Sequence, residues 1–109
     1  PAADRDAFEI LSASDEELLE HFGAWYIADR DPRYLRRNAL VAMANSAPTG
    51  DGQAAALIGH YLSDPDPLLR AHAVWAAGRV GRSDLLGEAG DEPDPTVREE
   101  IERVVGRGS

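Results

Sequence analysis

The segment LRRNALVAMA, residues 35–44, returns in altered form as LRAHAVWAAG, residues 69–78. The two segments align without a gap, and a weaker third copy, VREEIERVVG, covers residues 97–106. The arginine at the second position of each copy therefore recurs after 34 and then 28 residues. A period near 30 residues, built from helices, predicts a solenoid in which each unit packs on its neighbours.

An Asp-Pro pair precedes each copy, at residues 31–32, 66–67 and 94–95. Aspartate accepts hydrogen bonds from the free amides of a helix N-terminus, and proline fits the first helical position because it lacks an N–H. The pairs therefore predict helices over residues 32–45, 66–80 and 95–106.

Three shorter helices are expected between these. Ser14-Asp15-Glu16-Glu17 is a capping box, which opens a helix that we expect to reach about Tyr26. Residues 51–62 and 83–89 supply two more, and glycines mark the turns. No strand pattern occurs. The prediction is one all-α domain over residues 1–109, with six helices in three antiparallel pairs: hairpins at about 14–46, 51–80 and 83–107.

This repeated pattern resembles the short HEAT-like (armadillo/HEAT-type) repeats of many binding domains. The resemblance implies that the capping aspartates and the recurring arginines hold neighbouring repeats together. The residues expected to be structural on this basis are Asp31, Arg36, Asp66, Arg70, Asp94 and Arg98.

The composition is that of a globular protein, with 43% hydrophobic and 28% charged residues among 109. No apolar run approaches the roughly 18 residues needed to cross a membrane, so we expect no membrane partner. The chain has no cysteine, which excludes disulfides and cysteine-ligated metal or iron–sulfur sites within it and is compatible with a reducing cytoplasm. It begins at Pro1 without a methionine, and we expect it to be a piece of a longer protein.

The net charge of −9 is unevenly distributed. Residues 1–29 carry −7, residues 30–82 carry +3, and residues 83–109 carry −5. All eleven basic residues are arginines. A basic middle between two acidic ends leaves one region in which a polyanion could bind.

A polar stripe on the middle helices is the candidate binding surface. On an ideal helix Asn38 and Asn45 lie together, about 120° from the apolar side, although asparagine is a poor residue for a helix interior. The aligned stripe of the next repeat holds His72, Trp75 and Arg79. Guanidinium, amide and aromatic groups suit an RNA backbone and an unpaired base, but they also suit a protein hot spot or a solvated surface. The candidate residues are Arg33, Arg37, Asn38, Asn45, His72, Trp75 and Arg79, with Arg30 as an upstream extension.

Signals for catalysis are weak. The three histidines, His21, His60 and His72, lie on different expected helices without metal-ligand spacing. No glycine-rich phosphate loop is present, and the acidic runs fall in first helical turns, where they favour the helix dipole. We therefore expect no catalytic residue and no metal site in this chain.

Residues 7–81 resemble the C-terminal region of the epoxyqueuosine reductases, most specifically in RNALVA with Asn45 and in DPLLRAHAVWA, residues 66–76. The resemblance implies a parent oxidoreductase that reduces epoxyqueuosine in the wobble position of tRNA with cobalamin and two [4Fe–4S] clusters. It also implies that these cofactors belong to a missing upstream catalytic domain, and that the HEAT-like domain helps to hold the tRNA. The tRNA contacts would then fall on Arg37, Asn38, Asn45, His72 and Trp75, with Arg79 as a further candidate.

Two alternatives remain at this point. A protein-interaction scaffold would use the patch around Trp75 to dock a catalytic domain or another partner. A free-standing DNA-binding HEAT protein would have further repeats in a longer chain. A positive face open to solvent would favour RNA, and an apolar face centred on Trp75 would favour a protein contact.

Overall fold

A computed structural model describes residues 2–22, 31–87 and 91–108. Its helices are α1 (Ala2–Ser12), α2 (Asp15–Phe22), α3 (Arg33–Ser46), α4 (Gly52–Tyr61), α5 (Pro67–Arg79) and α6 (Pro95–Gly108), with a 3-10 helix η2 (Ser83–Leu85). No strand occurs within these three ranges. The all-α repeat fold expected from the sequence is confirmed, in a slab that measures 43 × 31 × 16 Å.

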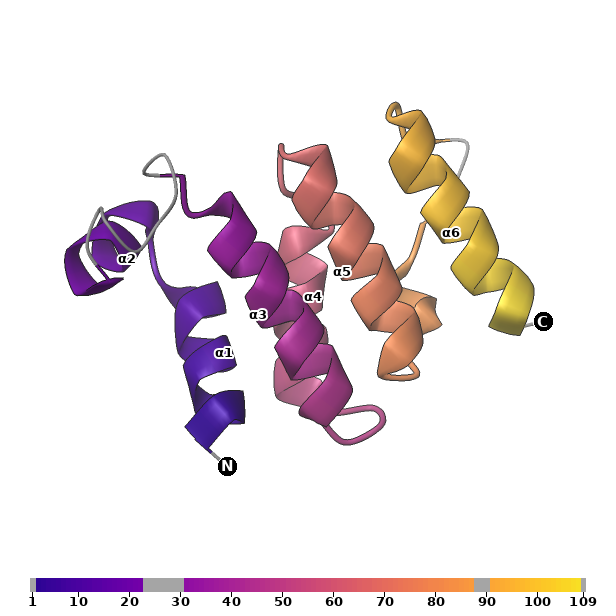
Figure 1. The fold of residues 1–109 in the computed structure, drawn as a ribbon. Coiled ribbons are helices and arrows are strands. Elements are labelled where there is room, and N and C mark those ends of the chain that lie inside the picture. Colours follow the sequence, from indigo (N-terminus) through magenta and orange to yellow (C-terminus); the bar gives the residue numbers. More distant parts are fainter. Residues whose placement is uncertain (1, 23–30, 88–90, 109) are drawn as a thin grey trace.

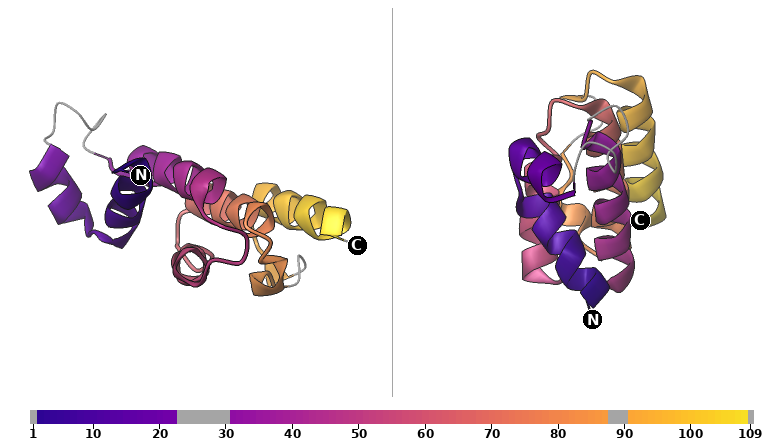
Figure 2. Two further views of the ribbon diagram at one scale, coloured as in Figure 1. Left: turned by 90° about the horizontal axis from the view of Figure 1, so that it is seen from below. Right: turned by 60° about the vertical axis from the view of Figure 1, so that its left-hand side comes forward.

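The long helices of the repeats form one row (Figure 1). α3, α5 and α6 lie side by side and run in the same direction, and α1 runs antiparallel beside α3. Turning the molecule shows α4 and η2 together on one side of this row (Figure 2). The row is therefore backed by a full helix in its middle and by a single 3-10 turn near its C-terminal end.

Aspartates begin the helices where the sequence predicted. The Asp66 carboxylate accepts the Leu68 N–H at 2.9 Å, and the Asp94 carboxylate accepts the N–H groups of Thr96 and Val97 at 2.8 and 3.1 Å. The Asp31 carboxylate accepts an N–H at 3.0 Å from the first residue of α3. These bonds satisfy amides that a helix leaves unpaired, which explains why each repeat helix begins there.

The capping box is also present. The Glu17 N–H donates to Ser14 Oγ and the Ser14 N–H donates to Glu17 Oε1, both at 3.1 Å. The hydrogen bonds from Ser14 lower the pKa of Glu17, because they favour the carboxylate. The helix that it starts is described as far as Phe22. The rest of the expected element, to Tyr26, lies outside the described residues.

Two elements differ from the sequence prediction. α1 was not expected, because its sequence has neither an Asp-Pro start nor a capping box, yet α1 packs antiparallel against α3. Of the helix expected over 83–89, the described residues form only η2, and Leu86 that follows it is extended, with ψ 135°; residues 88–89 lie outside the described structure. So short a segment, with Gly87 inside it, gains too few hydrogen bonds to offset helix nucleation. The described helix pairs are therefore α1 with α3 and α4 with α5, and the division into hairpins stays a prediction.

Apolar side chains of the row and of α4 behind it form the core. Leu40 and Met43 of α3 and Ile58 of α4 are fully buried. A smaller cluster of Val74, Val97 and Ile101 joins α5 to α6. These contacts make the repeats one continuous body, as expected for a solenoid.

The contact between α5 and α6 depends on a glycine. A Cβ atom built on Gly78 would lie 2.7 Å from Val104 Cγ1. At the equivalent position α3 carries Ala44, whose methyl group is buried without such a clash. The α5–α6 contact therefore leaves no room for a methyl group at this position of the repeat, whereas the α3 position accommodates one.

Candidate nucleic-acid interface

Five residues on the solvent side of the row form one accessible surface, which we call the α3–α5 ledge: Tyr34, Arg37, Asn38, Asn45 and Arg79. Tyr34, Asn38, Asn45 and Arg79 are exposed, and Arg37 is half-buried. The first four lie on α3 and the last on α5. They point to solvent because apolar residues occupy the opposite side of each helix.

A hydrogen bond crosses between the repeats within the ledge. Arg79 Nε donates to Asn45 Oδ1 at 3.1 Å. The two residues hold the same position of the repeat, 34 residues apart in sequence. The gap-free alignment of the two helices therefore predicted a real spatial neighbourhood.

Arg37 is held by two neighbours on its own helix. Its Nε and Nη2 donate to Asn38 Oδ1 at 3.2 and 3.1 Å. Its guanidinium also lies over the Tyr34 ring, 5.2 Å from the centroid. That distance is within the range of a cation–π contact.

Arg33 is used differently from its neighbours. Its Nε and Nη2 donate to the two carboxylate oxygens of Asp66 at 2.8 and 3.0 Å. These bonds raise the pKa of Arg33, and Asp66 also caps α5. Arg33 thus ties α3 to the start of α5, which leaves less of its guanidinium for a ligand. It also lies 5.2 Å from the Tyr34 centroid.

Two candidates of the second repeat are less accessible than the ledge. His72 is half-buried, and its Nδ1 lies 2.9 Å from the Leu68 carbonyl oxygen, so Nδ1 carries the proton and donates to that carbonyl. Trp75 is half-buried and packs against the main core. The stripe predicted from the sequence therefore has two parts. The ledge residues are accessible to a ligand, whereas His72 and Trp75 are partly covered by the protein.

Arg36 lies inside the protein, 8% exposed. Its guanidinium donates to the Asp15 carboxylate at 2.7 Å, to the Ile10 carbonyl at 3.2 Å and to the Tyr61 hydroxyl at 2.8 Å. The Tyr61 hydroxyl in turn donates to the Leu11 carbonyl at 2.7 Å. This network joins α3 to α1, α2 and α4. Burial raises the pKa of Tyr61, so it stays a neutral donor.

The equivalent arginines of the later repeats are closer to the surface. Arg70 forms a two-pronged ion pair with Glu92, at 2.9 and 3.0 Å, and also donates to the Asp64 carbonyl. Arg98 donates to the Glu92 carbonyl at 2.7 Å. Both therefore hold the segment before α6.

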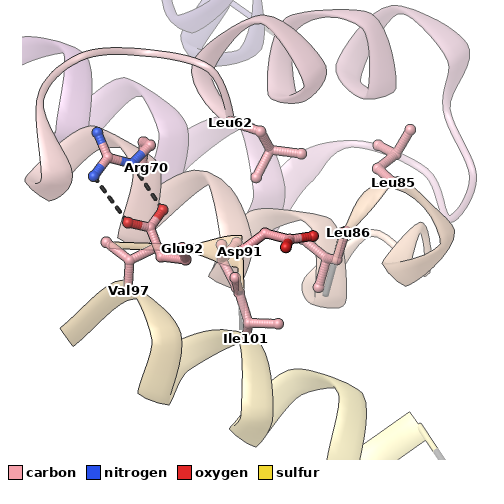
Figure 3. A pocket seen from close by; sticks show the side chains of 10 residues that line it. Leu62, Arg70, Leu85, Leu86, Asp91, Glu92, Val97 and Ile101 are labelled. Carbon is pink, nitrogen blue, oxygen red and sulfur yellow. Dashed lines mark hydrogen bonds and ion pairs between the residues drawn. The ribbon is translucent and has the colours of Figure 1, made fainter. Parts of the chain in front are cut away.

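A cavity of about 170 Å³ lies between α5, η2 and α6 (Figure 3). The Arg70–Glu92 pair closes one end, and the Asp91 carboxylate points along the wall towards Leu86. The remaining walls are mostly apolar: Leu62, Val74, Leu85, Leu86, Val97 and Ile101. It is partly open to solvent, and it occurs where the expected helix over 83–89 is shortened.

The described ranges contain neither a candidate metal cluster nor a helix suited to a bilayer. No group of three or more histidine, cysteine, aspartate or glutamate side chains there could hold a metal ion. No helix there is long and apolar enough to cross a bilayer. His21, Arg30 and Arg107 have no described side chains, so the upstream extension by Arg30 falls outside the described structure.

Sequence reasoning missed the role of Tyr34. The available signal was the position of Arg37, three residues after it, which places the two side chains together on a helix. It also missed Asp15, Tyr61 and Glu92 as partners of the repeat arginines. No local pattern announces them, because they lie more than 20 residues away in sequence.

The stacked helices, their repeated aspartate caps and the inter-repeat arginine contacts define a helical-repeat protein. A family model described as HEAT repeats matches residues 19–106. The chain belongs to the HEAT-repeat family.

Curated relatives narrow the similarity. The chain is 34% identical over 102 residues to epoxyqueuosine reductase of Bacillus cereus, which covers 86% of this chain and 25% of that protein. It is 29% identical over 97 residues to epoxyqueuosine reductase of Bacillus subtilis, which covers 88% of this chain and 21% of that protein. An uncharacterized Geobacillus stearothermophilus protein encoded in the gldA 3′ region is 30% identical over 100 residues, covering 91% of this chain and 45% of that protein. The chain spans about a quarter of the length of the reductases it matches. The search of solved structures gave no match.

Proposed function

We propose that this chain is the C-terminal HEAT-like domain of an epoxyqueuosine reductase and that its α3–α5 ledge docks tRNA. The observation that carries the proposal is the state of the arginines. Among those with described side chains, five pair with carboxylates and Arg98 bonds a backbone carbonyl. Arg37 and Arg79 instead bond side-chain amides, and both lie on the ledge.

The amides of the ledge reinforce its polarity. The Oδ1 atoms of Asn38 and Asn45 accept from Arg37 and Arg79, so their NH₂ groups remain to donate outward. The ledge therefore offers hydrogen-bond donors and positive charge. An acceptor-rich polyanion such as an RNA backbone complements both properties.

Binding by the ledge would be weak alone, because it offers about three to five phosphate contacts. The slope of log K against log salt would then be shallow, since each neutralised phosphate contributes roughly −0.7 to −0.9. The acidic ends of the chain, −7 over residues 1–29 and −5 over 83–109, would face away from the RNA. The HEAT-like domain would thus add to contacts made by the rest of the enzyme.

The chemistry of the parent protein would lie in a separate catalytic domain. Reduction of epoxyqueuosine in tRNA would use cobalamin and two [4Fe–4S] clusters there, in the cytoplasm. The present residues do not suit the clusters, since the chain contains no cysteine. We therefore assign no catalytic step to this chain.

The test removes the two ledge charges in the full-length protein. Arg37→Gln combined with Arg79→Gln should lower tRNA affinity roughly tenfold or more at moderate salt, and should flatten the salt slope by about 1.4 to 1.8. Fluorescence anisotropy with labelled tRNA over a salt series measures both. The cofactor content should not change.

A matched control changes the net charge equally on the other side of the row. Gln53 and Ala56 are exposed on α4, and converting both to glutamate also makes the net charge more negative by two units. This variant should bind tRNA nearly as tightly as the wild type. Equal binding by the ledge variant and the wild type would end the proposal.

The protein-interaction scaffold is the second candidate, and the placement of Trp75 bears on it. Its half-buried ring packs on the core and does not form the centre of an exposed apolar surface. The exposed large hydrophobic residues in the described ranges are Tyr34 and Val105, on different helices. A scaffold would retain its partner when the ledge charges are removed, which a pull-down with the catalytic domain would measure.

A further inference from the structure

We infer that Tyr34 is a stacking platform for an unpaired base, so that the α3–α5 ledge takes single-stranded RNA in preference to a duplex. This inference rests on the proposed function and goes beyond it by naming the state of the RNA and the residue that selects it. The sequence pointed to Trp75 as the aromatic of the surface, whereas the structure exposes 44% of Tyr34.

The Tyr34 ring is held by fixed neighbours. The Arg33 guanidinium lies 5.2 Å from the ring centroid and is fixed by two hydrogen bonds to Asp66. Asp66 is itself fixed, because its carboxylate caps α5. An aromatic ring beside a fixed cation costs little further entropy when a ligand stacks on it.

The second guanidinium is the adjustable member. Arg37 also lies 5.2 Å from the Tyr34 centroid, but its guanidinium hydrogen-bonds to the adjacent Asn38. A base can stack on the ring when Arg37 turns to a phosphate, or can stack on the planar Arg37 guanidinium. Either arrangement puts a cation, an aromatic ring and a base in one column.

The geometry selects unpaired RNA because only an unpaired base exposes its face. An A-form duplex presents its backbone and a shallow groove, and its base faces are covered by stacking within the helix. Charge contacts from Arg37 and Arg79 serve both forms of RNA. Tyr34 adds affinity for one of them.

The experiment compares two variants on two probes in the full-length protein. Tyr34→Leu removes the ring and keeps apolar bulk, and Tyr34→Phe keeps the ring as the matched control. The probes are a labelled RNA of about 12 nucleotides that cannot pair with itself, and the duplex that it forms with its complement. Anisotropy titrations over a salt series give affinity and slope, and circular dichroism melts check that each variant folds.

Tyr34→Leu should weaken single-strand binding roughly 5- to 100-fold, leave duplex binding within about twofold and keep the salt slope, because no charge is lost. Tyr34→Phe should stay within about twofold of the wild type on both probes.

Other outcomes overturn the platform. Equal weakening on both probes, no weakening, or loss with Tyr34→Phe would each do so. The proposed tRNA docking would survive these outcomes if the Arg37→Gln, Arg79→Gln variant still lost affinity. A wild-type protein that binds neither probe nor tRNA would remove both ideas.

Discussion

The first and last repeats place the same arginine in different surroundings. Arg36 lies in the interior, where its guanidinium donates hydrogen bonds to one backbone carbonyl, one tyrosine hydroxyl and one carboxylate. Arg98, at the equivalent position, is exposed and donates to one backbone carbonyl. The difference follows from the groups that surround each arginine, since α1, α2 and α4 supply the partners of Arg36, whereas the partner of Arg98 is the backbone just before its own helix. The repeat motif therefore fixes where the arginine lies on its helix. The neighbouring elements determine how much it contributes to the free energy of unfolding.

The largest expected effect comes from breaking the interior network. Arg36→Ala should lower the free energy of unfolding by about 3 kcal/mol, because it removes several hydrogen bonds and leaves buried acceptors without a donor. Arg98→Ala should cost no more than about 1 kcal/mol, since its site is solvated. Urea denaturation of the two variants beside the wild type measures the difference. Similar losses would show that burial does not control the weight of the repeat arginine.

Much of the fold could be predicted because helix starts are local. Asp66 and Asp94 lie within three residues of the amides that they cap, and the Ser14–Glu17 box is equally short. The helix α1 lacked such a signal. The shortening of the helix expected over 83–89 follows from the length of the segment and from Gly87, two local features to which the prediction gave too little weight.

A second comparison concerns the two helix contacts of the row. Gly78→Ala should destabilise the protein by about 1.5 kcal/mol, because the new methyl group meets Val104 at 2.7 Å and valine has little rotamer freedom in a helix. The better helix propensity of alanine offsets part of this cost. Thermal melting measures the change. The paired variant Gly78→Ala, Val104→Ala provides the rescue test, because Gly78→Ala should cost less when Val104 is already alanine. If Gly78→Ala lowers the melting temperature equally in the wild type and in the Val104→Ala protein, the close α5–α6 contact is not the cause.

The candidate site was only partly readable from the sequence. The repeat register correctly placed Asn45 beside Arg79, because equivalent residues of adjacent parallel helices become neighbours. The repeat register could not show that Trp75 packs on the core or that Arg33 pairs with Asp66. Both depend on how α5 packs against the neighbouring elements. The exposure of Tyr34 has the same origin. Register is a property of the sequence pattern, whereas depth is a property of the packed layers.

The smallest expected effect concerns pH and the intermediate repeat. Hydrogen bonds from Arg70 lower the pKa of Glu92 below its ordinary value, against the raising effect of burial. The ion pair therefore contributes its full stability above the unfolded pKa of 4.5, and that contribution is lost as the pH falls through the lower folded value. Glu92→Gln should cost about 1 kcal/mol near pH 7 and less near about pH 3, which lies below the unfolded pKa of 4.5, because keeping the folded carboxylate ionised there requires the release of a proton.

Thermal melts of the wild type and Glu92→Gln at the two pH values measure this shrinking difference, with Glu99→Gln as the matched control. Glu99 is exposed on α6 and accepts no hydrogen bond from a side chain in the described structure, so its variant should differ little from the wild type at either pH. A difference for Glu92→Gln that stays constant between the two pH values would mean that the charge of Glu92 is not the source of the lost stability. Arg70 would then resemble Arg98, and of the three repeat arginines only Arg36 would contribute strongly to the free energy of unfolding. A difference that disappears in acid would instead show that Arg70 contributes less to stability than Arg36 and more than Arg98. Its contribution would come from a charge pair that the protein partly buries.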